Sequence, residues 1–150
     1  MAAPKVVPIR ADMPAAITLA EVRSGVGVLK LEGRLCAEAV PACVAGMGVL
    51  LRRRPHTLVI DLARVATGPR AMDLLEAMRR HAEHHGVMVW LAAVPADLTR
   101  RLAECAQRQY RVMPTAQVAL QFLQEGKGAE VGGDVRADHP IWMRTHQRRQ

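Results

Sequence analysis

Three histidines, His81, His84 and His85, have the clearest spacing for chemistry in the sequence. Residues three and four apart share one face of a helix, so two of these imidazoles could bind one metal ion. The segment lacks a His-Glu-x-x-His arrangement, and no carboxylate is evident as a third ligand. A solvated helix end, where partly protonated histidines suit the helix dipole, explains the spacing more simply. We therefore predict no metal site and no cofactor.

No residues in the sequence pair as a catalytic nucleophile with its base. Asp61 follows an apolar run, but a lone carboxylate is a weak basis for catalysis. Cys36, Cys43 and Cys105 form no Cys-x-x-Cys pair, and we interpret them as small hydrophobic residues in a reducing cytoplasm. One of them pairing between chains is the alternative. We predict that the protein is not an enzyme.

Hydrophobic patterning excludes two locations for the chain. No window approaches the roughly 20 uninterrupted apolar residues that a membrane helix needs. Residues 1–13 lack the apolar core of about 7–15 residues that a secretion signal requires. We therefore predict a cytoplasmic protein with no membrane partner.

The composition also bears on nucleic-acid binding. The 150 residues, about one domain, carry a net charge of +7 but only 3% aromatic residues. The arginines are scattered near helical segments with acids close by, and so few aromatic rings cannot build a base-stacking surface. We favour a merely basic surface over a nucleic-acid site. A small nucleic-acid-associated protein and a scaffold or dimerisation domain stay as alternatives.

Apolar spacing predicts five strands after an extended, proline-containing lead-in at residues 1–14. Two short runs, 17–22 and 26–31, joined by Ser24-Gly25, predict a hairpin whose second strand ends at Gly33. Continuous apolar runs at 57–62 and 87–92 predict strands buried on both faces. A short strand is expected at 110–112.

Helical periodicity predicts four helices between and after these strands. The first carries a stripe from Cys36 to Leu50, with Pro41 in its first turn, and the second spans about 70–85. The third opens at Pro95 and the fourth follows Pro114-Thr115. In the second helix the spacing predicts surface ion pairs of Glu76 with Arg80 and of Arg79 with Glu83, while Met72, Met78 and Met88 are interpreted as core residues.

Alternation of strands and helices predicts an α/β fold with a mixed, largely parallel sheet and about four helices. We expect one domain over residues 15–124. Glycines alternating with charges from Gly126 onward predict a flexible, basic C-terminal tail over 125–150. Within that tail Ile141-Trp142-Met143 is either unstructured or a short docking peptide.

The order of elements resembles the STAS domain, the family of bacterial anti-sigma factor antagonists and their sulfate-transporter relatives. The resemblance covers residues 17–123. Val28-Leu-Lys-Leu-Glu-Gly-Arg-Leu35 is similar to the family's strand ending in Gly-Arg-Leu. Leu58-Val-Ile-Asp-Leu-Ala-Arg-Val65 and Gly86-Val-Met-Val-Trp-Leu-Ala92 are similar to its central strand and the next one, and Asp61 matches an acid common in the family. The resemblance implies a partner-switching regulator of transcription that binds an anti-sigma factor, a histidine-kinase-like ATPase.

In this family the loop after the central strand carries Asp-Ser-Ser-Gly, and the partner kinase phosphorylates one serine. The corresponding stretch here, with a one-residue gap after Val65, is Gly68-Pro69-Arg70-Ala71, which has no acid, no hydroxyl and no final glycine. Ser24 is the only serine of the chain, and Thr67 lies next to the stretch. We therefore predict a partner-binding surface without a phosphoacceptor, in a monomer or a homodimer. The surface comprises Thr67, Gly68, Pro69, Arg70, Met72 and Asp73.

Electrostatics explains why this substitution matters. A phosphate is favoured at a helix N-terminus, where free N–H groups and the helix dipole receive it. Pro69 is expected to delete one such N–H, and Arg70 to place a positive charge at the unfavourable end, at a cost of about 0.3–1 kcal/mol. Asp73 in the first turn is expected to offset that charge. Arg70 then either contacts an acid of the partner or is simply solvated.

Overall fold

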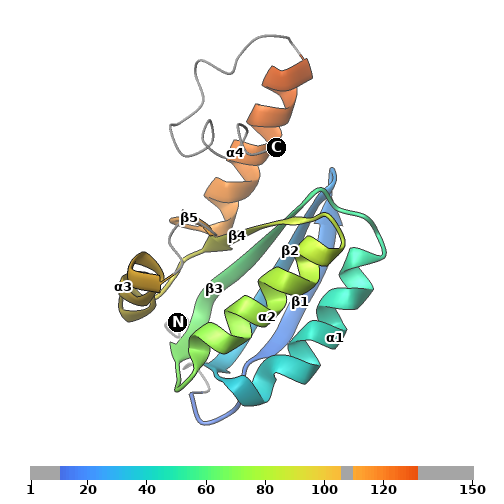
Figure 1. Cartoon of the computed structure of the whole chain (residues 1–150). Coiled ribbons are helices and arrows are strands. Elements are labelled where there is room, and N and C mark those ends of the chain that lie inside the picture. The colour runs from blue at the N-terminus through green and yellow to red at the C-terminus, as the bar shows by residue number, and fades with distance from the viewer. Residues whose placement is uncertain (1–10, 106–109, 132–150) are drawn as a thin grey trace, which may run out of the picture.

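The computed structural model describes residues 11–105 and 110–131, and its centre is a five-stranded sheet (Figure 1). The strands lie in the order β1-β2-β3-β4-β5. They are β1 (Ala16–Arg23), β2 (Val26–Leu35), β3 (Thr57–Thr67), β4 (Met88–Ala92) and β5 (Arg111–Met113). β1 runs antiparallel to β2, and the other neighbours are parallel. The predicted mixed, largely parallel sheet is confirmed.

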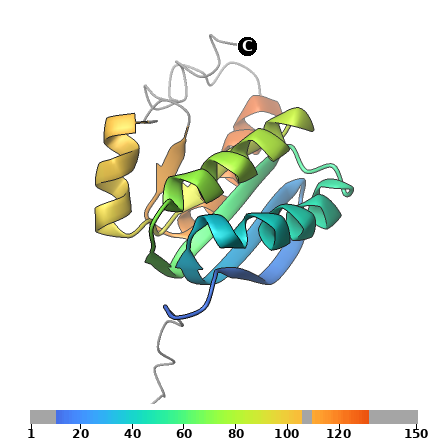
Figure 2. The same cartoon turned by 60° about the horizontal axis from the view of Figure 1, so that its bottom comes forward.

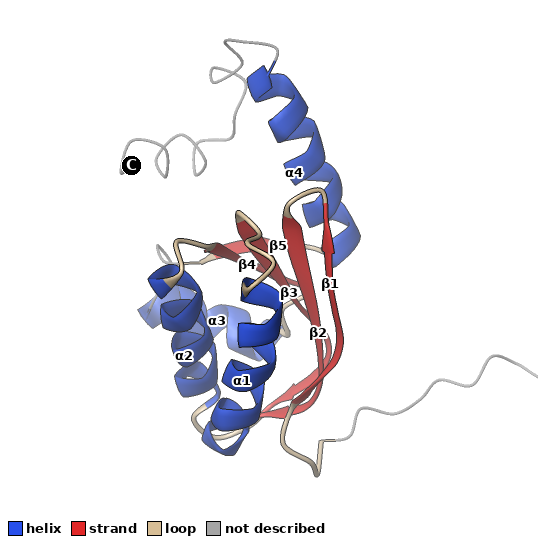
Figure 3. Ribbon diagram, turned by 90° about the vertical axis from the view of Figure 1, so that its right-hand side faces the viewer, coloured by secondary structure: helices blue, strands red, loops and turns tan. Residues whose placement is uncertain are grey.

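The helices form a layer on each face of this sheet. A short 3-10 turn η1 (Ala37–Ala39) leads into α1 (Val40–Leu51), which lies beside α2 (Ala71–His84) across one face (Figure 2). α3 (Ala96–Cys105) lies on that same side, near β4 and β5. α4 (Ala116–Val131) lies on the opposite face and extends past the edge of the sheet (Figure 3).

Two apolar clusters, one on each face, hold the layers together. Leu58 and Ile60 of β3 face the cluster under α1 and α2, whereas Val59 between them faces the cluster under α4. Trp90 of β4 joins the second cluster, where its ring lies 5.8 Å from that of Phe122. β3 and β4 are therefore buried on both faces, as their continuous apolar runs predict.

The expectation that Gly33 ends the second strand is wrong. β2 continues to Leu35, because the backbone N–H of Arg34 donates to the carbonyl of Met13 and the Ala15 N–H donates to the carbonyl of Arg34, both at 2.8 Å. A Cβ at Gly33 would lie 2.9 Å from the Met13 carbonyl oxygen, and the residue has φ +120°. Gly33 thus makes room for the lead-in instead of stopping the strand.

Three other boundaries differ from the prediction. β3 runs on to Thr67, which pairs in register with Leu35, so Thr67 belongs to the strand and not to the loop. Cys36 precedes η1, and α1 begins only at Val40, with Pro41 in its first turn as predicted. α4 continues to Val131, so the predicted start of the tail at residue 125 lies inside a helix. The Ile141-Trp142-Met143 segment lies outside the described residues.

None of the helices formed by residues 11–105 and 110–131 is long and apolar enough to cross a membrane.

Candidate functional site

A tight loop joins the end of β3 to the start of α2. Gly68 is buried, and its backbone N–H donates to the carbonyl of Leu35 at 2.9 Å, which ties the loop to β2. A Cβ at position 68 would lie 2.5 Å from Cγ of Arg34 and 2.7 Å from the Leu35 carbonyl oxygen. The second of these atoms belongs to the backbone and cannot move aside, so only glycine fits here.

Arg70 forms the N-terminal cap of α2 in a left-handed conformation. Its φ and ψ are 61° and 30°, and its side chain makes no capping hydrogen bond. A residue with a Cβ pays roughly 1–2 kcal/mol to adopt this conformation, which glycine takes freely. The loop geometry therefore holds a strained arginine at the surface, where its side chain is 74% exposed.

The charge of Arg70 is countered within its own turn. Its Nε donates to Oδ2 of Asp73 at 2.7 Å, and the Asp73 side chain is 49% exposed. The predicted offset by Asp73 is thus confirmed. Ion pairs this open to water typically contribute only about 0.2–1 kcal/mol, so a competing carboxylate can replace Asp73 at little expense.

The other predicted residues surround this turn. Thr67 donates its hydroxyl to Oδ1 of Asp97, 3.2 Å away in the first turn of α3. Met72 is half-buried and packs against the core beneath α1 and α2. Pro69 is exposed but precedes the cap residue Arg70, so it deletes none of the free N–H groups of α2, contrary to the expectation. The six residues extend from the last residue of β3 to the first turn of α2.

Arg34 is a neighbour of this turn that the sequence did not reveal. Its aliphatic stem lies against Gly68, and its Nε is buried without a hydrogen-bond partner among the described residues. Arg34 stands in a strand motif 34 positions into the chain, and only its parallel register with Ala66 of β3 brings it to the loop. A motif read along one strand cannot provide that pairing.

Comparison with known proteins finds similar structures but no matching sequence. No family model matches the sequence, and no curated protein does. An anti-sigma factor antagonist from Mycobacterium paratuberculosis is similar in structure, with 23% identity, a TM-score of 0.55 and coverage of 73% of this chain and 94% of that one. A protein from Thermotoga maritima assigned as an anti-sigma factor antagonist has 13% identity, a TM-score of 0.58 and coverage of 71% and 93%.

This chain has the fold of the anti-sigma factor antagonists. The structural match confirms the STAS resemblance that the sequence predicts, at the level of the fold. In this STAS-like fold the turn at residues 68–70 joins the central strand β3 to α2.

Further along α2, a second arginine is buried and binds two acids of the same helix. Arg79 is only 9% exposed; its Nε donates to Oε2 of Glu76 at 3.1 Å, and its other nitrogens bind Glu76 and Glu83. Tyr110 donates its hydroxyl to the same Oε2 at 3.2 Å. Hydrogen bonds from Arg79 hold the pKa of Glu76 below its usual value, while burial raises the pKa of Tyr110 above its own. The predicted ion pairs, including Arg80 with Glu76, exist, but Arg79 is not on the surface.

The histidines at the end of α2 contact one another, and Cys36 and Cys43 lie in the core. His81 and His85 meet edge to face with ring centroids 5.0 Å apart, and Nδ1 of His85 lies 3.0 Å from the His81 carbonyl oxygen. Within the part of the chain that the structure describes, no three potential ligands gather to hold a metal ion. Cys36 and Cys43 are buried free thiols, and burial raises the pKa of Cys43 to about 11.

Proposed function

We propose that this chain is a non-catalytic regulator that binds a protein partner in the manner of an anti-sigma factor antagonist, without the phosphorylation switch. The observation that carries the proposal is the turn at the start of α2, where Arg70 is strained and exposed. The turn from Gly68 to Arg70 contains no hydroxyl group. The binding surface comprises residues 67–70 with Met72 and Asp73.

The backbone of Arg70 supports a register for comparing this turn with Asp-Ser-Ser-Gly. The glycine of such a pattern suits a left-handed position, and in this turn Arg70 has the positive φ, whereas Ala71 is the first residue of α2. Arg70 then stands in place of the glycine, and Gly68 and Pro69 stand in place of the two serines. This register needs no gap after Val65 and replaces the one inferred from the sequence.

The surroundings of Gly68 support the absence of a phosphoacceptor. A serine there would need a Cβ within 2.7 Å of the Leu35 carbonyl oxygen. Thr67, which directly precedes Gly68, already donates its hydroxyl to Asp97. Occupancy of the surface is then set by concentration or by the state of the partner.

The chemistry of the turn indicates what the partner contributes. Arg70, exposed and held only by a solvent-screened ion pair, attracts an acidic side chain, and Met72 adds an apolar contact. The aliphatic stem of Arg34 lies against Gly68 and forms one wall of the turn. The proposed partner is an anti-sigma factor of the histidine-kinase-like ATPase type, with an acid at its contact surface.

Calorimetric titration against such anti-sigma factors encoded by the same genome tests the proposal. We expect binding that ATP leaves unchanged, no phosphate on the chain by mass spectrometry, and affinity lowered about tenfold or more by Arg70→Glu. Arg53→Glu, at an exposed position just after α1, is the matched control and should bind as the wild type does. Phosphate on Thr67, equal binding by Arg70→Glu, or no binding to any of these factors would contradict the proposal.

A further inference from the structure

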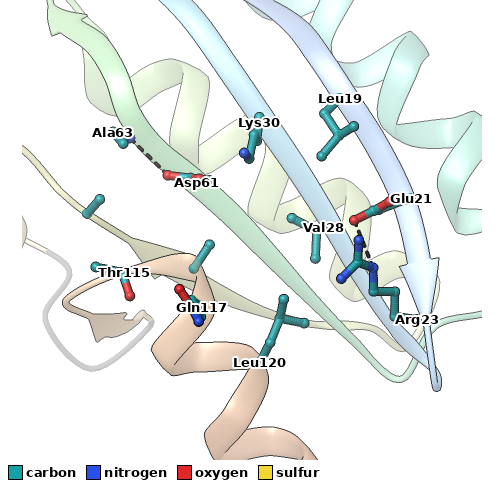
Figure 4. A pocket seen from close by; sticks show the side chains of 12 residues that line it. Leu19, Glu21, Arg23, Val28, Lys30, Asp61, Ala63, Thr115, Gln117 and Leu120 are labelled. Atoms are coloured by element: carbon teal, nitrogen blue, oxygen red, sulfur yellow. Dashed lines mark hydrogen bonds and ion pairs between the residues drawn. The ribbon is translucent and has the colours of Figure 1, made fainter. Parts of the chain in front are cut away.

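A groove runs along the sheet face that carries α4. α4 packs over Val59 and Trp90 of β3 and β4, and the described residues leave the neighbouring part of β1 and β2 uncovered (Figure 3). The space between α4 and these strands has a volume of about 560 Å³. Leu19, Val28 and Leu120 provide apolar surface within it (Figure 4). Leu19 is 37% exposed, high for a leucine on a sheet.

The charged side chains in this groove are neighbours of opposite sign. Glu21 and Arg23 form an ion pair with each other at 3.0 Å. Lys30 and Asp61 are register partners on β2 and β3, so their side chains stand side by side on the same face (Figure 4). Among the described residues neither has an ion-pair partner, and Asp61 accepts only the N–H of Ala63 at 3.0 Å. The groove thus presents one available cation beside one available anion.

Such a pair is complementary to itself. When two identical surfaces meet across a two-fold axis, every contact occurs twice. If one residue of the first copy touches a second residue of the other copy, that second residue in the first copy also touches the first residue of the other. An axis passing between Lys30 and Asp61 brings each ammonium to the carboxylate of the other copy. A surface of a single charge sign would instead require an unlike partner.

We propose that this groove is the contact face of a symmetric homodimer, in which Lys30 of each copy pairs with Asp61 of the other. Leu19 of the two copies becomes buried in the contact, and α4, which stands beside the groove as a ridge, packs toward the groove of the second copy. α2 and its first turn belong to the helical layer on the opposite face, so dimerisation leaves the proposed partner surface accessible. The dimer and the partner surface can therefore be refuted independently of each other.

Sedimentation equilibrium of the full chain over a concentration series tests the dimer. We expect a reversible dimer for the wild type. Lys30→Asp places acids opposite acids, and because symmetry counts each lost contact twice, it should weaken dimerisation by about a hundredfold. The double variant Lys30→Asp, Asp61→Lys exchanges the two signs on both copies and should restore the dimer.

Two further variants keep the test decisive. Val49→Glu changes a residue that is 60% exposed on α1, on the other face, and should dimerise as the wild type does. Leu19→Glu leaves Lys30 and Asp61 in place and should weaken the dimer; it decides the question if circular dichroism shows that the double variant is unfolded. A wild type that stays monomeric, a folded double variant that stays monomeric, or an unchanged dimer in Leu19→Glu would overturn the proposal.

Discussion

The two ends of α2 carry the same kind of interaction in different surroundings. At its start Arg70 pairs with Asp73, and the two side chains are 74% and 49% exposed. Farther along, Arg79 pairs with Glu76 and Glu83, and its side chain is 11% exposed. Both sets have helical spacing, so the sequence alone does not distinguish them. The second set also has a partner from outside the helix, because Tyr110 donates its hydroxyl to Glu76.

This contrast teaches that an arginine's surroundings decide whether it stabilises the fold or remains available. When one partner of a buried ion pair is removed, the other keeps its charge with neither a counter-charge nor full solvation. That loss lowers the stability of the fold. An exposed pair exchanges readily with water and with other charges. We therefore expect Arg79 to contribute to stability, whereas Arg70 is the residue we propose for binding.

The largest expected effect is that of Arg79→Met, which removes the cation from the buried cluster. Glu76 then keeps only the exposed Arg80 as a counter-charge, so the free energy of unfolding should fall by about 1–2 kcal/mol. Arg80→Met is the matched control, because the Arg80 side chain is 76% exposed, and it should change stability by less than about 0.5 kcal/mol. Urea unfolding measures both, and equal losses in the two variants would remove the distinction.

Acid should weaken the same cluster. The pKa of Glu76 lies below its ordinary 4.5 in the folded protein, chiefly because Arg79 donates hydrogen bonds to the carboxylate. Its contribution to stability is therefore complete above pH 4.5 and is lost as the pH falls through the lowered pKa. Thermal unfolding between pH 7 and pH 3 should show a shallower acid-side decline in Glu76→Gln than in the wild type. Parallel curves would contradict this linkage.

A smaller effect is expected when Arg70 is released from its neighbour. Asp73→Asn frees the guanidinium, so affinity for an acidic partner should rise about threefold to tenfold while stability changes by less than about 1 kcal/mol. Glu104→Gln, which removes an exposed acid from α3, controls for net charge and should leave affinity nearly unchanged. Calorimetric titration gives both values, and weaker binding by Asp73→Asn would show that Asp73 itself contacts the partner.

The smallest effect concerns backbone strain. Arg70→Gly removes the unfavourable left-handed arginine and should raise the free energy of unfolding by about 0.5 kcal/mol, even though the ion pair is lost. Arg80→Gly, in the interior of the same helix, should instead lower it by about 1 kcal/mol. If Arg70→Gly also binds the partner as tightly as the wild type does, Arg70 has no role in recognition.

Sequence patterns predicted the elements and their order, because apolar runs and helical periods are local signals. They failed where a distant segment decides the outcome. Gly33 looks like the end of a strand until the lead-in is seen to pair with Arg34. Helical spacing predicts Arg79 on the surface, but the side chain is buried in a cluster that Tyr110 joins from far along the chain.

The sequence likewise predicted some features of the candidate site and missed others. The residues of the site could be proposed from the sequence because the end of the central strand and the start of a helix can both be located there. The left-handed backbone of Arg70 could not be predicted, since a positive φ is unusual for arginine. Arg34 was missed because its place beside Gly68 depends on the pairing of β2 with β3.

The tight packing around Gly68 also restricts which single substitutions the chain accepts. Any side chain at this position meets both a neighbouring arginine stem and a fixed carbonyl. Replacing Gly68 by serine would therefore require a coordinated change in β2 to open the space. A single substitution therefore cannot introduce a phosphorylatable serine at position 68. Engineering such a switch has to begin with changes in β2.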